Sequence, residues 1–236
     1  MIALLSSMSF ESDLILSRMK KVLLKEAAGK KVHKGKLAGL DVLLINTGIG
    51  KVNASHSGTV VIENYPVDKV INIGVGGAYS GSGVVVGDVA IASKEIFGDD
   101  GVITSKGWKD MKEINIPVLQ KGRRKYFNEF PLSTPSQAFF KDQGSTAKRI
   151  RSGPFVTVGS ATGTQKRARE LEKKFGGICE NMEGAAIAQV CAIYGIPLIE
   201  VRGISNMVGT RDKKKWKLKE ASDNCQKVVL NLLESA

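Results

Sequence analysis

Two segments of the chain carry side chains suited to a sugar-linked base. Glu183 lies in Glu180–Ala186, where a loop enters an alanine-rich helical pattern, and Asn206 ends Arg202–Asn206, just beyond an apolar strand pattern. Ligands of α/β sheets bind beyond the carboxyl ends of the strands, so we expect both side chains to meet there. A carboxylate accepts hydrogen bonds from ribose hydroxyls, and an amide can pair with a base edge. The two segments therefore predict a nucleoside site.

The elements that must position these residues alternate along the chain. Apolar runs rich in β-branched residues predict strands at Ile2–Leu5, Val42–Ile45, Val70–Ile73, Val84–Ala92, Phe155–Val158 and Pro197–Ile204. Helical patterns between several of them cover Phe10–Ala27, Val52–Asn64, Gln165–Phe175, Glu183–Tyr194 and Lys213–Leu233. This alternation predicts an α/β fold with a mixed central β-sheet flanked by helices on both faces.

Three local patterns refine this fold. Leu37–Asp41 is typical of a turn, and it joins a polar strand around Lys31–Lys36 to the next apolar strand, which makes the sheet mixed. Gly195 and Pro197 end the alanine-rich helix, because glycine accepts a left-handed cap and proline cannot continue a helix. The irregular stretch Phe97–Lys148 is rich in Gly, Lys and Pro and predicts long loops beside the site.

The residues that follow the apolar runs predict the wall of the pocket. They fall into five segments, namely Ser7–Glu11, Thr47–Gly50, Gly74–Gly77, Gly159–Gly163 and Ser205–Asn206. Each segment alone has a simpler explanation, since acidic residues suit helix starts and Asn and Gly suit turns. Their joint placement at one edge of the sheet favours an enzyme.

Several motifs spread over nearly the whole chain resemble those of the nucleoside phosphorylase and nucleosidase superfamily. They are Glu11 after the first strand, Gly48–Val52, Gly74–Gly77, Val86–Asp88, Asn181–Ala186 and Arg202–Asn206. Their order and spacing are similar to those of 5′-methylthioadenosine/S-adenosylhomocysteine nucleosidases and futalosine hydrolases. The resemblance implies a cofactor-free enzyme that cleaves an N-ribosidic bond and forms a homodimer.

The resemblance also implies roles for individual residues. Glu11 would activate the attacking water, Glu183 beside Met182 would bind the ribose hydroxyls, and Asn206 would hold the purine at N7 and its 6-substituent. These roles agree with the chemistry, since the reaction builds positive charge on the sugar and negative charge on the departing base. The remaining predicted substrate-binding residues come from the wall segments and from the basic run after Asn206, namely Val75, Gly76, Ser160, Thr162 and Arg211.

Asn206 departs from the methylthioadenosine enzymes, which have aspartate at this place. The amide can donate to O6 of hypoxanthine while its carbonyl accepts from a protonated N7, whereas a carboxylate oxygen would face O6 as a second acceptor. An unpaired buried acceptor costs about 1–3 kcal/mol, which corresponds to roughly tenfold to hundredfold discrimination. Asn206 therefore favours a 6-oxopurine leaving group.

The segment Ser205–Asp212 with Trp216 resembles the futalosine hydrolases in particular, which release hypoxanthine from futalosine in the menaquinone route. Futalosine carries a benzoate on its 5′ side, and Arg211 is the candidate cation for that carboxylate. In place of the serine and the stacking phenylalanine of the methylthioadenosine enzymes, the chain has Val75 and Thr162. Trp108 or Tyr79 would then have to stack on the base, and we interpret Trp216 as a packing residue.

Water is the predicted nucleophile. A phosphorylase binds a dianion, normally with arginine among its glycine-rich loops, but Ser6–Ser12 and Gly74–Gly83 contain no arginine and Glu11 would repel phosphate. The nearest alternative is a methylthioadenosine/S-adenosylhomocysteine nucleosidase that tolerates asparagine.

Composition sets broader bounds. The 236 residues, 42% hydrophobic and 25% charged, suit a single domain over 1–236 without a linker. The apolar start lacks the features of a signal peptide and no run is long enough for a membrane span, so we expect a cytoplasmic protein with no membrane partner. Three cysteines and two histidines show no ligand spacing, which gives no metal site, and Cys191 is expected to be a buried small hydrophobe.

The formal net charge of +12 raises a different possibility, a basic protein that binds nucleic acid without catalysis. The densest basic runs are Lys121–Lys125 and Arg211–Lys217, and neither lies in a recognisable nucleic-acid module. A solvated basic surface explains them more simply, so we expect a small-molecule substrate and no nucleic-acid partner.

Overall fold

A ten-stranded mixed sheet forms the centre of the computed structural model, which describes residues 1–135, 139 and 149–235. Its strands are β1 (Ile2–Ser6), β2 (Lys20–Ala27), β3 (Lys30–Leu37), β4 (Leu40–Asn46), β5 (Lys69–Ala78), β6 (Val89–Phe97), β11 (Glu129–Pro131), β12 (Ile150–Thr157), β13 (Cys179–Asn181) and β14 (Leu198–Met207). β1 pairs in parallel with β4 and β5, while β3 pairs antiparallel with β2 and β4. The predicted mixed sheet and its early hairpin are therefore confirmed.

At one end of the sheet five strands pair in a closed ring. β14 pairs in parallel with β5 and antiparallel with β6, β6 pairs with β12, β12 with β13, and β13 again with β5. Through this ring, Gly77 of β5 is the register partner of Glu180 on β13 and of Asn206 on β14. Two side chains that are far apart in the sequence thus flank the same point of β5.

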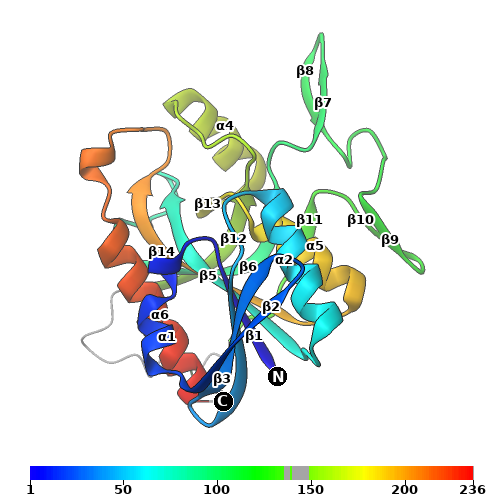
Figure 1. The fold of residues 1–236 in the computed structure, drawn as a ribbon. Helices are drawn as coiled ribbons and strands as arrows, with labels where there is room; N and C mark the ends of the chain where they lie inside the picture. Colours follow the sequence, from blue (N-terminus) through cyan, green and yellow to red (C-terminus); the bar gives the residue numbers. More distant parts are fainter. Residues whose placement is uncertain (136–138, 140–148, 236) are drawn as a thin grey trace.

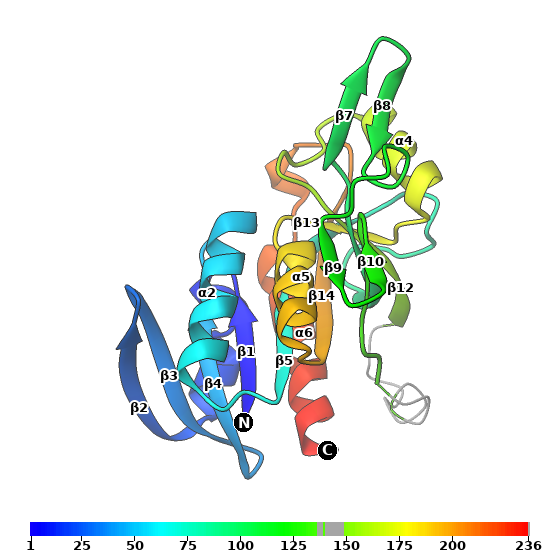
Figure 2. The ribbon, with the colours of Figure 1, turned by 90° about the vertical axis from the view of Figure 1, so that its right-hand side faces the viewer.

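Helices cover both faces of the sheet, as predicted (Figures 1 and 2). The helices are α1 (Asp13–Arg18), α2 (Lys51–Asn64), α4 (Gln165–Phe175), α5 (Gly184–Tyr194) and α6 (Leu218–Glu234). Successive strand side chains point to opposite faces, so Leu4 of β1 packs into the core with α1 and α6, while Ala3 and Leu5 pack into the core with α2 and α5. Cys191 of α5 is buried in the second core, as expected.

The predicted irregular stretch contains short hairpins. β7 (Gly101–Thr104) pairs with β8 (Gly107–Asp110), and β9 (Leu119–Lys121) pairs with β10 (Arg124–Tyr126). The β7–β8 hairpin projects from the body of the protein (Figure 2). Residues 136–138 and 140–148, which the same prediction covers, lie outside the described residues. Within the described part of the chain, no helix combines the length and hydrophobicity needed to cross a membrane.

Three predicted elements differ from the structure. The helix predicted over Phe10–Ala27 stops at Arg18, and Lys20–Ala27 is the exposed edge strand β2, because a hairpin turn at Ala28 and Gly29 pairs it with β3. The strand predicted from Val84 begins at Val89, since Asp88 closes a turn by accepting a hydrogen bond from the Val85 amide. The last helix begins at Leu218, after one separate turn at Lys213–Lys215.

The glycine run Gly74–Gly77, predicted to follow its strand, lies inside β5, because β13 and β14 pair with this part of the strand. A Cβ on Gly76 would lie 2.5 Å from Cys179 Sγ and 2.9 Å from the Glu180 carbonyl oxygen. Asn206 likewise lies within β14 rather than beyond it, after a bulge between Ile204 and Asn206. The bulge changes the register at the position that carries the amide.

Candidate active site

One cavity of about 350 Å³ collects side chains from all five predicted wall segments, at the carboxyl ends of β1, β5 and β14. Its volume suits a small-molecule ligand. It is lined by Ser7, Met8, Phe10, Glu11, Ile49, Val75, Gly76, Gly77, Ala161, Thr162, Glu180, Asn181, Met182, Glu183, Arg202, Ser205, Asn206, Val208, Arg211, Trp216 and Leu218. Ser160 is the one predicted site residue that does not line this cavity, because it is exposed on the loop after β12.

Glu11 enters the cavity from the short helical turn after β1 and is buried to 3% exposure. Its Oε1 accepts a hydrogen bond from the Val75 amide at 2.9 Å, and its Oε2 accepts one from the Met8 amide at 2.8 Å. Burial raises the pKa of Glu11, although the positive charge of Arg202 and the two amides act in the opposite direction. Glu11 is thus a fixed carboxylate whose pKa is shifted toward the range of a general base.

Glu183 lies at the N-terminal end of α5 and is buried. Its Oε1 accepts a hydrogen bond from the Gly50 amide at 2.8 Å, and its Oε2 lies 3.6 Å from Arg202 Nη1. Asn181 caps the same helix end, where its Oδ1 accepts from the amides of Glu183 and Gly184. The helix start therefore fixes the backbone of Glu183, while Gly50 and Arg202 fix its carboxylate.

Arg202 interacts electrostatically with the carboxylates of both Glu11 and Glu183, and its side chain is almost completely buried. Its Nε donates to Glu200 Oε1 at 2.9 Å, and its Nη1 donates to the Val75 carbonyl at 3.3 Å. Burial lowers the pKa of Arg202, but the nearby carboxyl groups of Glu200, Glu183 and Glu11 outweigh it and raise the pKa, which keeps Arg202 cationic. We did not include Arg202 among the predicted site residues, yet Glu200 and Arg202 stand two apart in an apolar strand, and that spacing puts both on one face.

Asn206 faces the cavity with its amide held from two sides. The Ser205 hydroxyl donates to Asn206 Oδ1 at 2.8 Å, and Asn206 Nδ2 donates to the Met207 carbonyl at 3.1 Å. One N–H and one lone pair of the amide stay free for a ligand. Across Gly77, Glu180 accepts from the Thr162 amide at 2.9 Å and from the Tyr79 hydroxyl at 2.9 Å, which fixes the loop that carries Thr162.

The aromatic residues of the cavity differ from those proposed to stack on a base. Tyr79 is fully buried behind Glu180, and Trp108 lies on the β7–β8 hairpin against Phe175, so neither lines the cavity. Phe10 and Trp216 do line it. Phe10 directly precedes Glu11, which is the signal that could have identified it, while Trp216 stands in the segment we interpreted as packing.

Arg211 lies at the exposed rim of the same cavity. Its guanidinium carbon is 4.8 Å from the centre of the Trp216 ring, a distance typical of a cation–π contact. The contact places a positive charge beside an aromatic ring at one end of the cavity. Arg211 and Trp216 thus form a cationic, aromatic rim.

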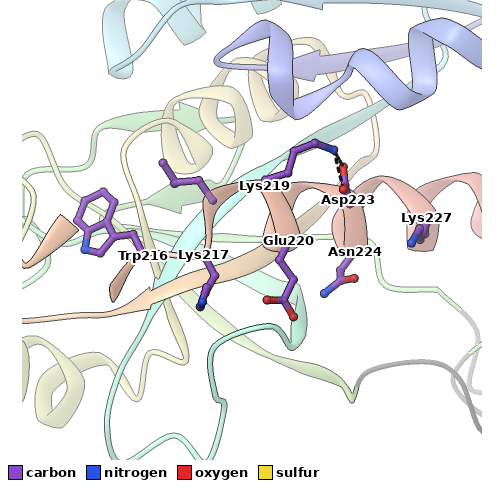
Figure 3. Close-up of a pocket in the computed structure, with 8 residues that line it drawn as sticks. Trp216, Lys217, Lys219, Glu220, Asp223, Asn224 and Lys227 are labelled. Carbon is purple, nitrogen blue, oxygen red and sulfur yellow. Dashed lines mark hydrogen bonds and ion pairs between the residues drawn. The ribbon is translucent and has the colours of Figure 1, made fainter. Parts of the chain in front are cut away.

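A second hollow of about 510 Å³ lies on the other side of Trp216 and Leu218, which line both cavities. Figure 3 shows that its other side chains come from the start of α6, and that Lys219 is paired with Asp223. The ion pair is 2.6 Å long and spans one helical turn. This hollow gathers no residues from separate elements apart from that shared wall, so the smaller cavity is the candidate active site.

Comparison with known proteins identifies the relatives of the chain. Residues 1–234 match the family model described as phosphorylase superfamily. The chain is 35% identical over 202 residues to the futalosine hydrolase of Thermus thermophilus, covering 84% of this chain and 83% of that protein. It is 30% identical over 234 residues to the 5′-methylthioadenosine/S-adenosylhomocysteine nucleosidase of Geobacillus kaustophilus, covering 98% and 95%.

Solved structures of similar fold include two nucleosidases. The 5′-methylthioadenosine/S-adenosylhomocysteine nucleosidase of Colwellia psychrerythraea in complex with adenine has a TM-score of 0.83 and 25% identity, covering 98% of this chain and 93% of that one. The corresponding enzyme of Neisseria meningitidis in complex with methylthio-immucillin-A has a TM-score of 0.85 and 24% identity, covering 100% and 99%. Both share the α/β fold described above.

Replacing Arg202 with methionine should destabilise the protein by about 3–5 kcal/mol, because it leaves the buried carboxylates near it without their cation. The loss, measured by urea unfolding, should shrink as the pH falls, since protonation neutralises those carboxylates. Arg151→Met on β12 removes an exposed guanidinium and is the control. Equal losses in the two variants would show that Arg202 does not hold the site together.

Proposed function

The chain belongs to the phosphorylase superfamily, and we propose that it hydrolyses the N-ribosidic bond of a 6-oxopurine nucleoside, with futalosine as the preferred substrate. The products would be hypoxanthine and dehypoxanthinyl futalosine. The observation that carries the proposal is that two buried carboxylates and one carboxamide, Glu11, Glu183 and Asn206, line a single cavity. The 35% identity to a futalosine hydrolase supports the substrate.

In this proposal the two carboxylates act on the sugar. Glu183 accepts hydrogen bonds from the ribose hydroxyls, with its orientation fixed by Gly50 and Arg202. N7 of the base takes up a proton from solvent water, because the Asn206 amide has none to give. Glu11 then removes a proton from the attacking water as its oxygen bonds to C1′, and the electrons of the breaking C1′–N9 bond neutralise the N7-protonated base, which leaves as hypoxanthine. Both carboxylates also stabilise the positive charge that develops on the ribose.

Water rather than phosphate is the proposed nucleophile. Among the described residues, the arginines that line the cavity are Arg202 and Arg211. Arg202 is engaged through Nε by Glu200 and through Nη1 by Glu183 and the Val75 carbonyl, so that only its Nη2 lacks a partner among the described residues, and Arg211 lies at the rim. A phosphate dianion beside Glu11 would therefore meet a carboxylate whose nearest cation already balances Glu183 and Glu11.

Asn206 supports the choice of base. Ser205 donates to Oδ1 and Met207 accepts from Nδ2, so the amide has a defined orientation with one N–H left for O6 of a 6-oxopurine. The remaining lone pair of Oδ1 can accept a hydrogen bond from the protonated N7 of the departing base. Phe10 or Trp216 takes the place of the stacking residues that we first considered.

Arg211 supports an acidic group on the 5′ side of the nucleoside. Its guanidinium lies at the rim over Trp216, where a carboxylate on an extended 5′ substituent can form a charge-assisted hydrogen bond while the ring packs against the aromatic part. Neither contact is useful to a substrate that ends in a methylthio group. The rim therefore favours futalosine over the smaller nucleosides.

The nearest alternative is a 5′-methylthioadenosine/S-adenosylhomocysteine nucleosidase, since relatives with that name match 98% of the chain. A nucleic-acid binder is less well supported, because Lys121 binds carbonyls at the end of α5 and Arg211 stacks on Trp216.

The proposal includes a homodimer in the cytoplasm. Two apolar side chains support a subunit interface beside the cavity, because Ile49, which lines it, and the neighbouring Val52 are 54% and 83% exposed. All three cysteines are free thiols, which supports a reducing compartment.

A substrate panel tests the choice of base. With futalosine, inosine and 5′-methylthioadenosine, the protein should release hypoxanthine with a higher kcat/KM than adenine, measured by chromatography. Asn206→Asp should shift the ratio toward adenine by roughly tenfold to hundredfold, because it leaves an acceptor facing O6. Asn64→Asp, on the exposed side of α2, should leave the ratio unchanged. A wild-type preference for adenine would refute the proposed substrate class.

The role of Arg211 predicts a selective loss. Arg211→Met should raise KM for futalosine by about fivefold to tenfold, because a charge-assisted hydrogen bond is lost, and should leave KM for inosine unchanged. Lys215→Met removes a nearby, 82% exposed cation and serves as the control for net charge. Equal effects on both substrates would place the 5′ carboxylate elsewhere.

Glu11 predicts a dependence of activity on pH. Burial raises the pKa of Glu11, so the basic carboxylate is lost by protonation at a higher pH than for an exposed glutamate. The value of kcat/KM should therefore fall as the pH falls through that raised pKa. Glu11→Gln should lower kcat by about 10²–10⁴-fold and abolish this acid limb, whereas Glu170→Gln on the exposed face of α4 should retain it. An acid limb that survives in Glu11→Gln would rule out Glu11 as the base.

A further inference from the structure

A pair of buried carboxyl groups lies below the candidate active site. Glu95 of β6 and Glu200 of β14 are both 0% exposed, and one carboxyl oxygen of each lies beside the backbone of Gly184. A Cβ added to Gly184, the first residue of α5, would overlap Glu95 Oε1 and would lie 2.5 Å from Glu200 Oε2. Both oxygens therefore occupy the space that a side chain at this helix end would need.

Glu95 is already surrounded by donors. Its Oε1 accepts from Asn181 Nδ2 at 2.6 Å, and its Oε2 accepts from the Thr157 hydroxyl at 2.7 Å and from the Ile96 amide at 3.2 Å. Asn181 and Thr157 in turn accept from the first amides of α5. Glu95 thus holds the two groups that cap the helix on which Glu183 stands.

Glu200 has the opposite environment. Its Oε1 accepts from Arg202 Nε at 2.9 Å, whereas its Oε2 has no hydrogen-bond donor among the described residues. The neighbour of that oxygen is Glu95 Oε1, which is another acceptor unless a proton lies between them. Two ionised carboxylates in contact and out of water would repel each other strongly.

We propose that Glu95 and Glu200 share one proton, held on Glu200 Oε2 and donated to Glu95 Oε1, and that this pair positions Glu183 and Arg202 for the reaction. The donor pattern places the proton on Glu200, because the Asn181 amide and the Ile96 amide donate to Glu95, and the Thr157 hydroxyl is closer to Glu95 Oε2, at 2.7 Å, than to its other acceptor, Asn181 Oδ1, at 3.0 Å. The pair then carries one negative charge instead of two, which reduces the excess of negative charge around Arg202, where Glu183 and Glu11 also lie. Glu95 acts on Glu183 through the cap of α5, and Glu200 acts on it through Arg202.

The surrounding titratable groups are compatible with this proton. Burial raises the pKa of both Glu95 and Glu200. The charged groups that face the pair are Arg202 on β14, Glu183 at the start of α5 and Glu11 before α1. The thiols of Cys179 on β13 and Cys191 on α5 also face it, and burial raises their pKa, to about 12 for Cys191, which keeps them neutral. The positive charge of Arg202 acts against burial by lowering the pKa of both carboxyls, so it favours the loss of one of the two protons.

If Glu200 carries the shared proton, replacing Glu200 with glutamine and replacing Glu95 with glutamine should have different effects. In Glu200→Gln the carbonyl can still accept from Arg202 and the NH₂ can donate to Glu95, as the proton does. In Glu95→Gln the NH₂ would face a donor in either orientation, Asn181 Nδ2 on one side or the Ile96 amide on the other. The amide should therefore be tolerated at position 200 and not at position 95.

The first experiment measures stability, which is independent of the substrate. A carboxyl that stays protonated in the folded state and ionises in the unfolded state makes stability fall as the pH rises toward the folded-state pKa. Urea unfolding from about pH 6 to about pH 9 should show this decline in the wild type and a slope smaller by one proton in Glu200→Gln. Glu129→Gln, which removes an exposed carboxylate paired with Lys94, should keep the wild-type slope. An unchanged slope in Glu200→Gln would overturn the shared proton.

The second experiment measures activity and rests on the proposed nucleosidase function. Glu200→Gln should keep kcat at neutral pH to within about threefold, while Glu95→Gln and Glu200→Leu should lower it by more than about tenfold, with a smaller change in KM. Equal tolerance of the two amides would overturn the placement of the proton. If the wild type cleaves none of the nucleosides, the proposed function fails, and the stability slopes still decide whether the proton is present.

Discussion

The buried guanidinium of Arg202 is the interaction on which the site depends. A cation without access to water is costly unless its charge and its N–H groups are matched by partners. Glu200 and the Val75 carbonyl provide hydrogen bonds, and Glu183 provides an ion pair at 3.6 Å. In return the cation allows carboxylates to stay close together below the cavity, which their mutual repulsion would otherwise prevent. The fold thus holds buried carboxylates at the wall of the cavity, shielded from bulk water.

This arrangement explains why glycine occupies positions that pack against the charges. A Cβ on Gly74 would lie 2.6 Å from Arg202 Nη1 and 2.8 Å from Glu11 Oε1, so the strand can pass the ion cluster only without a side chain. Gly184 has the same function at the start of α5, above Glu95 and Glu200. The glycines that look like turn residues in the sequence are therefore the places where backbone and buried charges meet.

The sequence predicted the parts of the fold that follow simple periodicity. Strands with continuous apolar runs and helices such as Gln165–Phe175 were located within a few residues, and the rule that ligands bind beyond the carboxyl ends of strands located the cavity wall. Lys20–Ala27 was missed because its helix-compatible composition is overridden by pairing with β3. Ser160 and the stacking residues were misplaced because side-chain direction in a loop depends on long-range contacts, such as that between Glu180 and the Thr162 amide.

Under the proposed function, the residues that act on the sugar are structurally separate from the residue that contacts the base. Glu11, Glu183 and Arg202 are tied to one another through Val75 and through direct charge contact, so a change in any of them alters the whole cluster. Asn206 follows a bulge in β14, and its amide is oriented by Ser205 and Met207. A substitution there changes the hydrogen-bond pattern offered to a ligand without removing a member of the charge cluster. Under the proposed function, the same carboxylates can therefore serve different bases, and residue 206 is the position expected to decide the leaving group.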